Sequence, residues 1–173
     1  DVVNTYSEEQ LSKIIFEYGE ERHARKIAKL IVEERKSSPI EKTSDLITLI
    51  KRAYPERASK HPAKKTFQAI RIEVNRELEV LENAMSKAVE LLKVGGRLAI
   101  ITFHSLEDRI VKNKFKDLAT ACKCPKDIPI CVCGGVKKFE IITKKPIIPI
   151  DDELKNNNRA HSSKLRILER IFD

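Results

Sequence analysis

The sequence of 173 residues predicts an α/β protein in which a helical part precedes a part that contains a sheet. Residues 95–112 carry this prediction, because they read as a helix end, a strand and a new helix. Residues 98–103 form an apolar run, which is typical of a strand covered on both faces in a parallel sheet. In an open α/β sheet, ligands bind beyond the carboxyl ends of the strands, and His104 and Ser105 stand at such an end. The pattern indicates an enzyme of the nucleotide-binding type.

The composition fits a soluble globular protein in the cytoplasm. Charged residues make up 35% of the chain and hydrophobic residues 41%, and no apolar run approaches the ~20 residues of a membrane span. The charged segment 1–10 is unlike a signal peptide. The net charge is +8, and residues 113–173 hold 13 Lys and Arg against 8 Asp and Glu. This surplus favours an anionic partner such as nucleic acid, although a lysine-rich solvated surface accounts for the same count.

Three short helices are expected in the first third of the chain. Ser7 and Gln10 have the spacing of a capping box, and Gly19 is expected to end the helix that they begin. A second helix is expected over residues 20–36 and a third over residues 43–54. These short elements predict a compact all-α unit.

The longest periodic segment begins at Pro62 and ends at Gly95, where a glycine can adopt the left-handed conformation that stops a helix. Apolar side chains recur along it at steps of three and four residues, which predicts one continuous helix. A break near Asn75 would leave two helices instead.

The last part of the chain completes the sheet. Ser105 is expected to cap a helix over residues 106–118, with Asp108 at capping-box spacing. Strands are expected over residues 136–143 and 164–171, separated by a short helix near residues 151–155. These last two strands are expected to pair antiparallel.

Four segments carry a resemblance that covers nearly the whole chain. They are residues 1–4 with 18–22, residues 61–78, residues 103–112 (Phe-His-Ser-Leu-Glu-Asp-Arg-Ile-Val-Lys) and residues 158–166. Through them the sequence resembles the bacterial 16S ribosomal RNA cytosine-N4 methyltransferases. Asn158 and His161 depart from that family, in which proline and arginine are usual at these places.

The resemblance implies a fold, an activity and a cofactor. The expected fold is the C-terminal part of a class I (Rossmann-like) methyltransferase sheet with an all-α insertion domain. Residues 1–75 would be the substrate-recognition insertion, and residues 76–173 the C-terminal half of the methyltransferase domain. The implied reaction is N4-methylation of a cytidine in 16S rRNA with S-adenosylmethionine. The cofactor loop is expected upstream of Asp1, so no residue here is assigned to the cofactor, and the chain is expected to be inactive alone.

Two residues of the third segment are candidates for catalysis. A cytosine amine is a poor nucleophile, so its methylation requires loss of a proton to an acceptor. An imidazole can accept a proton near neutral pH, so His104 is the first candidate. The alternative is that His104 forms hydrogen bonds to the backbone at the strand end and holds the crevice in shape. Asp108 is the second, although the helix dipole favours a carboxylate at that position without any reaction.

Basic side chains in the resembling segments and close to them are candidates for contact with RNA phosphates. Arg71 could also bridge to a carboxylate of the sheet part. Each cation taken alone is more often a solvated surface charge. The candidates are Lys64, Lys65, Arg71, Arg109, Lys112, Arg159, Lys164 and Arg166.

The cysteines form two Cys-x-Cys pairs, Cys122 with Cys124 and Cys131 with Cys133. Four thiols within twelve residues of a cytosolic protein suggest a structural zinc site. The pairs are tighter than the usual spacing with two intervening residues, so free thiols or a disulfide remain alternatives.

A function of another class remains open: a non-catalytic RNA- or ribosome-binding module built on a helical bundle and a small sheet. The strand at residues 98–103 is expected to pair with a strand that the chain does not supply. The alternatives are that a second copy fills the gap, which would form a homodimer, or that the fragment rearranges. Partners are thus expected to be 16S rRNA or the small ribosomal subunit, without a membrane.

Overall fold

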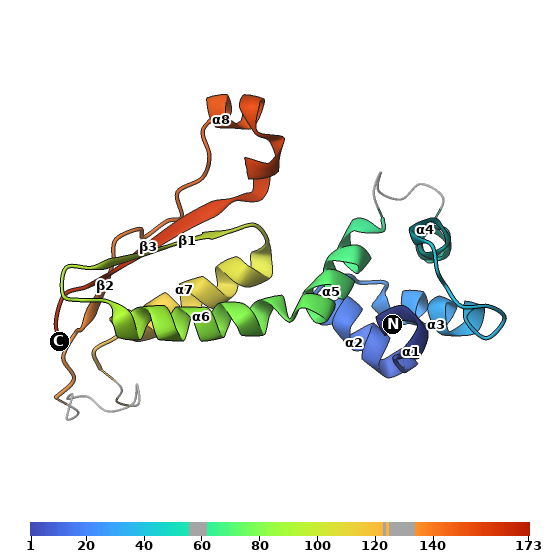
Figure 1. The fold of residues 1–173 in the computed structure, drawn as a ribbon, viewed down its shortest axis with the longest axis horizontal. Helices are drawn as coiled ribbons and strands as arrows, with labels where there is room; N and C mark the ends of the chain where they lie inside the picture. Colours follow the sequence, from blue (N-terminus) through green and yellow to red (C-terminus); the bar gives the residue numbers. More distant parts are fainter. Residues whose placement is uncertain (56–61, 123, 125–133) are drawn as a thin grey trace. The chain divides into compact units, whose positions relative to one another are not determined.

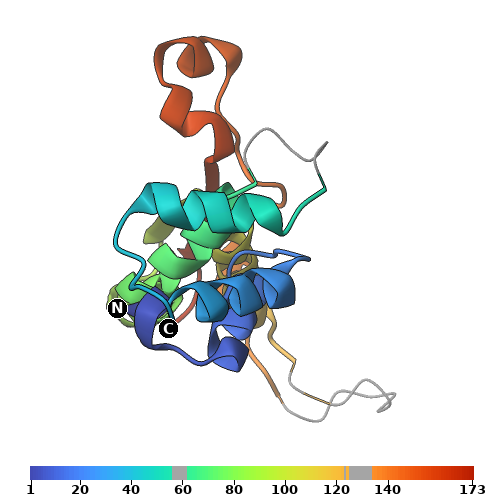
Figure 2. The same cartoon turned by 90° about the vertical axis from the view of Figure 1, so that its right-hand side faces the viewer.

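The computed structural model describes residues 1–55, 62–122, 124 and 134–173, which form two compact units. The helical unit spans Asp1–Glu77, and the sheet unit spans Leu78–Asp173. Figures 1 and 2 show helices and loops in the described part of the first, and helices packed on a small sheet in the second. The mixed α/β class predicted from the sequence is confirmed.

The helical unit is held together by the inward faces of its helices. Leucine and isoleucine side chains at three- and four-residue steps are buried together, because this spacing places them on one side of each helix. Fully buried members are Leu11, Ile15, Ile27, Ile31 and Ile50. The helices are α1 (Val2–Thr5), α2 (Glu8–Glu17), α3 (Ala24–Glu34), α4 (Thr43–Arg52) and α5 (Lys64–Asn75).

The capping box at Ser7 is confirmed. The Ser7 hydroxyl accepts from the amide of Gln10 at 3.2 Å, and the Gln10 side chain accepts from the Ser7 amide at 2.9 Å. The predicted start of the second helix at residue 20 is wrong, because Glu20 lies in the left-handed region with a φ of 49°. The Glu21 carboxylate accepts from a backbone amide two residues on, and α3 begins only at Ala24.

Gly19 ends α2 for a different reason from the one expected. Its own φ is not in the left-handed region, which is instead occupied by Glu20. A Cβ at Gly19 would lie 2.5 Å from the carbonyl oxygen of Ile15 and 2.7 Å from that of Lys65 on α5. Glycine is therefore required here because the backbones of α2 and α5 approach closely.

The long helix predicted over residues 62–95 is wrong, and the alternative of a break near Asn75 is confirmed. Arg76 has φ 51° and ψ 38°, which is the left-handed region, and it separates α5 from α6 (Glu77–Leu91). A left-handed arginine interrupts the helical hydrogen bonds although no glycine or proline marks the place. Farther along, Gly95 has a φ of 80°, as expected for a glycine that ends a helix.

The sheet unit contains three strands among its described residues. They are β1 (Arg97–Thr102), β2 (Phe139–Ile141) and β3 (Lys164–Arg170), in the order β1-β3-β2. The strand β3 pairs antiparallel with both neighbours, with Ile100 opposite Arg166 and Ile141 opposite Leu168. Because β1 and β2 both oppose β3, they run parallel to each other. The predicted antiparallel pairing of the last two strands is confirmed.

One face of this sheet is covered by α6 and by α7 (Ser105–Ala119), as Figure 1 shows. Side chains from both helices meet side chains of β2 and β3 in a single buried cluster, which forms the core of the unit. Its members are Met85, Val89, Val111, Phe115, Phe139 and Leu168.

The sequence predicted that both faces of β1 are covered. Within the described residues this prediction is wrong, because one face is exposed. Leu98 and Ile100 face the helices and are half-buried, whereas the side chain of Ile101 is 58% exposed. Among the described residues only β3 pairs with β1, so the other edge of β1 has no strand beside it there. An apolar strand with an unpaired edge and an exposed face is unusual in a globular domain, because an unpaired edge can pair with a strand of another chain.

The strand predicted over residues 136–143 is shorter, with only Phe139–Ile141 in the ladder. Beyond it, the Thr143 hydroxyl accepts from the Ile167 amide at 2.9 Å, so a side chain takes the place of the next ladder bond. The short helix is confirmed as α8 (Asp151–Asn156) and is followed by a 3-10 helix, η1 (Asn158–Ser162).

Candidate functional site

The carboxyl end of β1 is shaped by a capping interaction between His104 and Glu107. The Nδ1 atom of His104 accepts from the Glu107 amide at 3.4 Å. In return, one carboxylate oxygen of Glu107 accepts from the amides of Phe103 at 2.8 Å and His104 at 3.2 Å. Its other oxygen lies 3.5 Å from Nε2 of His104. The bond to Nδ1 and the bonds to the Glu107 carboxylate together form a capping box.

The predicted cap at Ser105 with Asp108 is wrong by one residue. Ser105 is the first residue of α7, and the box is formed by His104 and Glu107. Histidine is a less common N-cap than serine, so the sequence pattern favoured Ser105 as the cap. Because Glu107 and not Asp108 takes part in the capping box, the Asp108 side chain can contact β3.

Asp108 forms ion pairs with two cations of β3, and the pair with Arg166 is buried. The Arg166 guanidinium donates from Nε to Oδ1 at 2.7 Å and from Nη2 to Oδ2 at 3.1 Å. The Lys164 ammonium donates to Oδ2 at 3.4 Å. The side chains of Asp108 and Arg166 are only 13% and 9% exposed. Such a two-point contact fixes the orientation of both groups.

This ion pair determines what Asp108 can do chemically. The hydrogen bonds from Arg166, and then the positive charges of Arg166 and Lys164, hold the pKa of Asp108 below its ordinary value although burial opposes them. A carboxylate with a lowered pKa is a weak proton acceptor. The geometry ties α7 to β3, and a catalytic role for Asp108 stays a prediction.

The other predicted RNA contacts are divided between the two units. Arg71 is engaged by Glu77 through two hydrogen bonds of 2.8 and 3.0 Å. Arg109 lies on α7 and Arg159 in η1. Lys112, also on α7, lines a cleft with Arg166.

A pocket in the helical unit brings Lys64 and Lys65 next to a buried acid. The side chains of Glu21, His23 and Tyr54 line it with them. The Tyr54 hydroxyl donates to the Glu21 carboxylate at 2.5 Å. Burial, followed by this hydrogen bond, raises the pKa of Tyr54, so the phenol stays protonated and Glu21 keeps its donor. The pocket is therefore lined by Lys64 and Lys65 and by Glu21, whose carboxylate already accepts a hydrogen bond from Tyr54.

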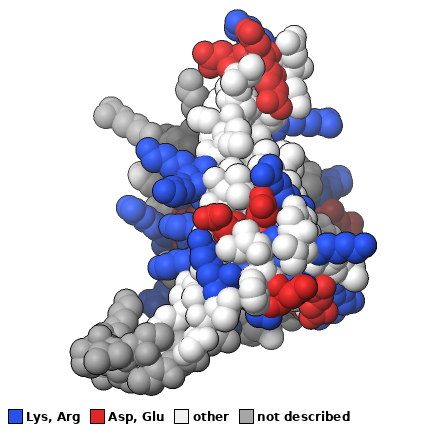
Figure 3. Space-filling model, turned by 90° about the vertical axis from the view of Figure 1, so that its left-hand side faces the viewer, with Lys and Arg blue, Asp and Glu red and all other residues white. Residues whose placement is uncertain are grey.

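Sequence reasoning missed three lysines that line the cleft between α7 and β2 with Lys112. They are Lys116, Lys137 and Lys144. The spacing of Lys112 and Lys116, one helical turn apart, could have indicated a basic face on α7. Figure 3 shows one face of the molecule on which lysine and arginine side chains gather along the left of the view.

The predicted zinc site cannot be placed. Cys131 and Cys133 lie outside the described residues, while Cys122 is exposed and Cys124 half-buried. Tetrahedral coordination needs four ligand atoms, so two described cysteines give no test of it.

No helix within the described residues is long and apolar enough to cross a membrane.

Comparison with known proteins gives a family and close relatives. A family profile described as the MraW methylase family matches residues 1–171. The protein named ribosomal RNA small subunit methyltransferase H from Clostridioides difficile (strain 630) is 55% identical over 99% of this chain and 56% of its own length. Its namesake from Caldicellulosiruptor saccharolyticus is 56% identical over the same shares.

A third relative of that name, from Carboxydothermus hydrogenoformans, is 54% identical over 99% of this chain. The chain spans about half the length of the curated relatives it matches, since 56% of each is covered. Identity at this level over almost every residue is far above what a shared fold alone produces, and the match includes both units described above. The chain therefore belongs to the MraW methylase family.

Proposed function

We propose that this chain is the C-terminal part of a methyltransferase that uses S-adenosylmethionine to methylate the N4 amine of a cytidine in small-subunit ribosomal RNA. The carrying observation is the open edge of β1 in a chain whose relatives are nearly twice as long. Those relatives carry the name ribosomal RNA small subunit methyltransferase H. The residues Asp1–Glu77 would recognise RNA, and Leu78–Asp173 would complete the catalytic sheet.

The strand order supports this assignment. A class I methyltransferase sheet ends with an antiparallel strand inserted between two parallel ones, and β3 lies in this way between β1 and β2. The missing strands of the sheet would then pair with the open edge of β1. Helices on the second face would cover Ile101, whose side chain is 58% exposed.

The cofactor would supply an electrophilic methyl group on a sulfonium. Of the groups at the carboxyl end of β1, His104 and Glu107 cap α7, and Asp108 is held by Arg166. We therefore assign no cofactor contact to these three side chains. Their contribution is to hold the strand end rigid, so that the crevice where ligands bind in such sheets keeps its shape.

A chimera tests the proposal. The part of the Clostridioides difficile relative that this chain does not match is joined ahead of this chain, and the chain alone serves as control. We expect the chimera to bind S-adenosylmethionine and to transfer a labelled methyl group to small ribosomal subunits that lack the modification. The chain alone should do neither.

A folded chimera that binds the cofactor but labels no RNA would contradict the proposal. If that chimera still bound RNA, the alternative of a non-catalytic RNA-binding module would be favoured. A homodimer through the edge of β1 stays a prediction, and the chimera would remove it by occupying that edge.

A further inference from the structure

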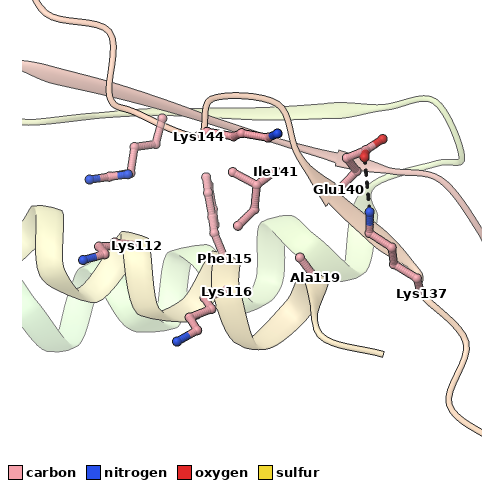
Figure 4. Close-up of a pocket in the computed structure, with 9 residues that line it drawn as sticks. Lys112, Phe115, Lys116, Ala119, Lys137, Glu140, Ile141 and Lys144 are labelled. Carbon is pink, nitrogen blue, oxygen red and sulfur yellow. Dashed lines mark hydrogen bonds and ion pairs between the residues drawn. The ribbon is translucent and has the colours of Figure 1, made fainter. Parts of the chain in front are cut away.

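The sheet unit has a half-open cleft of about 420 Å³ between the second half of α7 and the strand β2. Figure 4 shows Phe115 and Ile141 pointing into the space between these two elements, with lysines around it. Phe115 is almost fully buried and belongs to the core, so the floor of the cleft is rigid. The rim is formed by Lys112, Lys116, Lys137, Glu140, Lys144 and Arg166.

The charges of this rim are mostly unopposed. Lys137 pairs with Glu140 at 3.2 Å, and Arg166 pairs with Asp108. In the described part of the chain, Lys112, Lys116 and Lys144 form no ion pair, and all three are exposed. Three exposed lysines without an ionic partner give the cleft a positive potential, which favours an anionic ligand there.

We infer that this cleft binds the phosphodiester backbone of the RNA substrate, at nucleotides that flank the modified one. The inference rests on the proposed function and extends it to a surface that the catalytic crevice does not include. Lysine ammonium groups act on phosphates as point charges, without the two-point geometry that reads a base. The apolar floor fits the ribose of a nucleotide whose phosphates meet the rim.

The position of the cleft along α7 separates it from the crevice. The helix begins at the carboxyl end of β1, where ligands bind in sheets of this class. Lys116 lies eleven residues after Ser105, which corresponds to ~16 Å along a helix. If the target base of a single-stranded RNA lies in the crevice, its own phosphate is too far away to contact the cleft. The cleft would therefore contact the phosphate of a neighbouring nucleotide.

Salt-dependent binding of RNA to this chain tests the inference. The probe is a labelled single-stranded RNA of mixed sequence, and its affinity is measured by fluorescence anisotropy over a range of salt concentrations. We compare the triple variant Lys112→Ala, Lys116→Ala and Lys144→Ala with the charge-matched variant Lys87→Ala, Lys93→Ala and Lys155→Ala. The second set is exposed and does not line the cleft.

The cleft variant should lose about 2 from the slope of log affinity against log salt, since each phosphate contact on a single strand contributes about 0.7. Its affinity at low salt should fall at least about tenfold. The matched variant should keep the slope of the unsubstituted chain. Circular dichroism should report the same fold for all three proteins, because exposed lysines change stability little.

The inference would be overturned by equal slopes for the two variants, by no RNA binding to the unsubstituted chain, or by displacement of RNA by a free nucleotide at equal affinity. Binding of poly-glutamate, with RNA affinity unaffected by the cleft substitutions, would assign the cleft to an acidic protein and overturn it too. The proposed function is measured separately by methyl transfer in the chimera. A chimera that labels no RNA would therefore leave a positive binding result for the cleft in place.

Discussion

Asp108 on α7 and Arg166 on β3 are joined by two hydrogen bonds of 2.7 and 3.1 Å inside the sheet unit. They are 58 residues apart in the chain, and each side chain is at most 13% exposed. Because Arg166 stands opposite Ile100 in the ladder, the pair ties α7 to the middle strand beside β1. The contact therefore holds the helix that starts at the carboxyl end of β1.

Replacing one partner of this pair should destabilise the sheet unit. In Asp108→Ala the Arg166 guanidinium stays buried without its acceptor, and we expect the free energy of unfolding to fall by about 3 kcal/mol. Urea denaturation followed by circular dichroism measures the change. The double variant Asp108→Ala with Arg166→Met is the control and should be more stable than Asp108→Ala. A double variant less stable than the single one would contradict this account.

The stability that Asp108 contributes should depend on pH in one direction. Its pKa is lowered in the folded state, mainly by hydrogen bonds from Arg166, so folding favours the ionised form. This contribution is present above the unfolded pKa of about 3.9 and is lost as the pH falls through the lower folded value. The difference in unfolding free energy between the unsubstituted chain and Asp108→Asn should be largest near neutral pH and should shrink below pH ~4. A difference that grew on acidification would refute the assignment.

Gly19→Ala should loosen the contact between α2 and α5. The new Cβ would stand 2.5 and 2.7 Å from the carbonyl oxygens of Ile15 and Lys65, so backbone must move. We expect a loss of about 2 kcal/mol, seen as faster hydrogen exchange of amides in α2 and α5. Gly95→Ala is the comparison: its Cβ meets nothing within 4 Å, and only its left-handed conformation costs about 1 kcal/mol. Unchanged exchange in Gly19→Ala would show that the approach is looser than described.

Local signals in the sequence predicted the elements well, whereas contacts between elements were out of reach. The box at Ser7, the left-handed Gly95 and the strand before His104 each follow from residues a few positions apart. Whether a face of β1 is buried depends on helices that are distant in the sequence. The apolar run therefore predicted the strand, but it did not predict that one of its faces is exposed.

The candidate site was predicted in the same uneven way. The sequence predicted Lys112, Lys164 and Arg166 as RNA contacts, and this role stays a prediction. It did not indicate their neighbours in the fold. The ion pair with Asp108 joins residues more than fifty positions apart, and no local pattern encodes it. The cleft likewise needs Lys144 of one segment beside α7 of another. Distant pairings of this kind arise from the fold, which single-sequence patterns do not specify.

The break between α5 and α6 predicts an unusual order of stabilities at Arg76. In a helix interior, alanine is more stable than glycine by about 1 kcal/mol. Arg76 has a φ of 51°, and left-handed backbone costs residues other than glycine about 1 kcal/mol. We therefore expect Arg76→Gly to be at least as stable as Arg76→Ala in thermal unfolding. An alanine variant clearly more stable than the glycine variant would show that α5 and α6 form one helix in solution.

His104 offers a separation of capping from catalysis. Its Nδ1 accepts from the Glu107 amide, so this nitrogen belongs to the cap, and its Nε2 lies 3.5 Å from the Glu107 carboxylate. Asparagine is a good N-cap but cannot accept a proton near neutral pH. Alanine can neither cap the helix nor accept a proton. We expect His104→Ala to lose about 1 kcal/mol of stability and His104→Asn to lose almost none. In the chimera, His104→Asn should keep its rate of methyl transfer. A stable His104→Asn chimera that binds cofactor and RNA but transfers no methyl group would instead make His104 the proton acceptor, because the substitution leaves the cap and removes only the base.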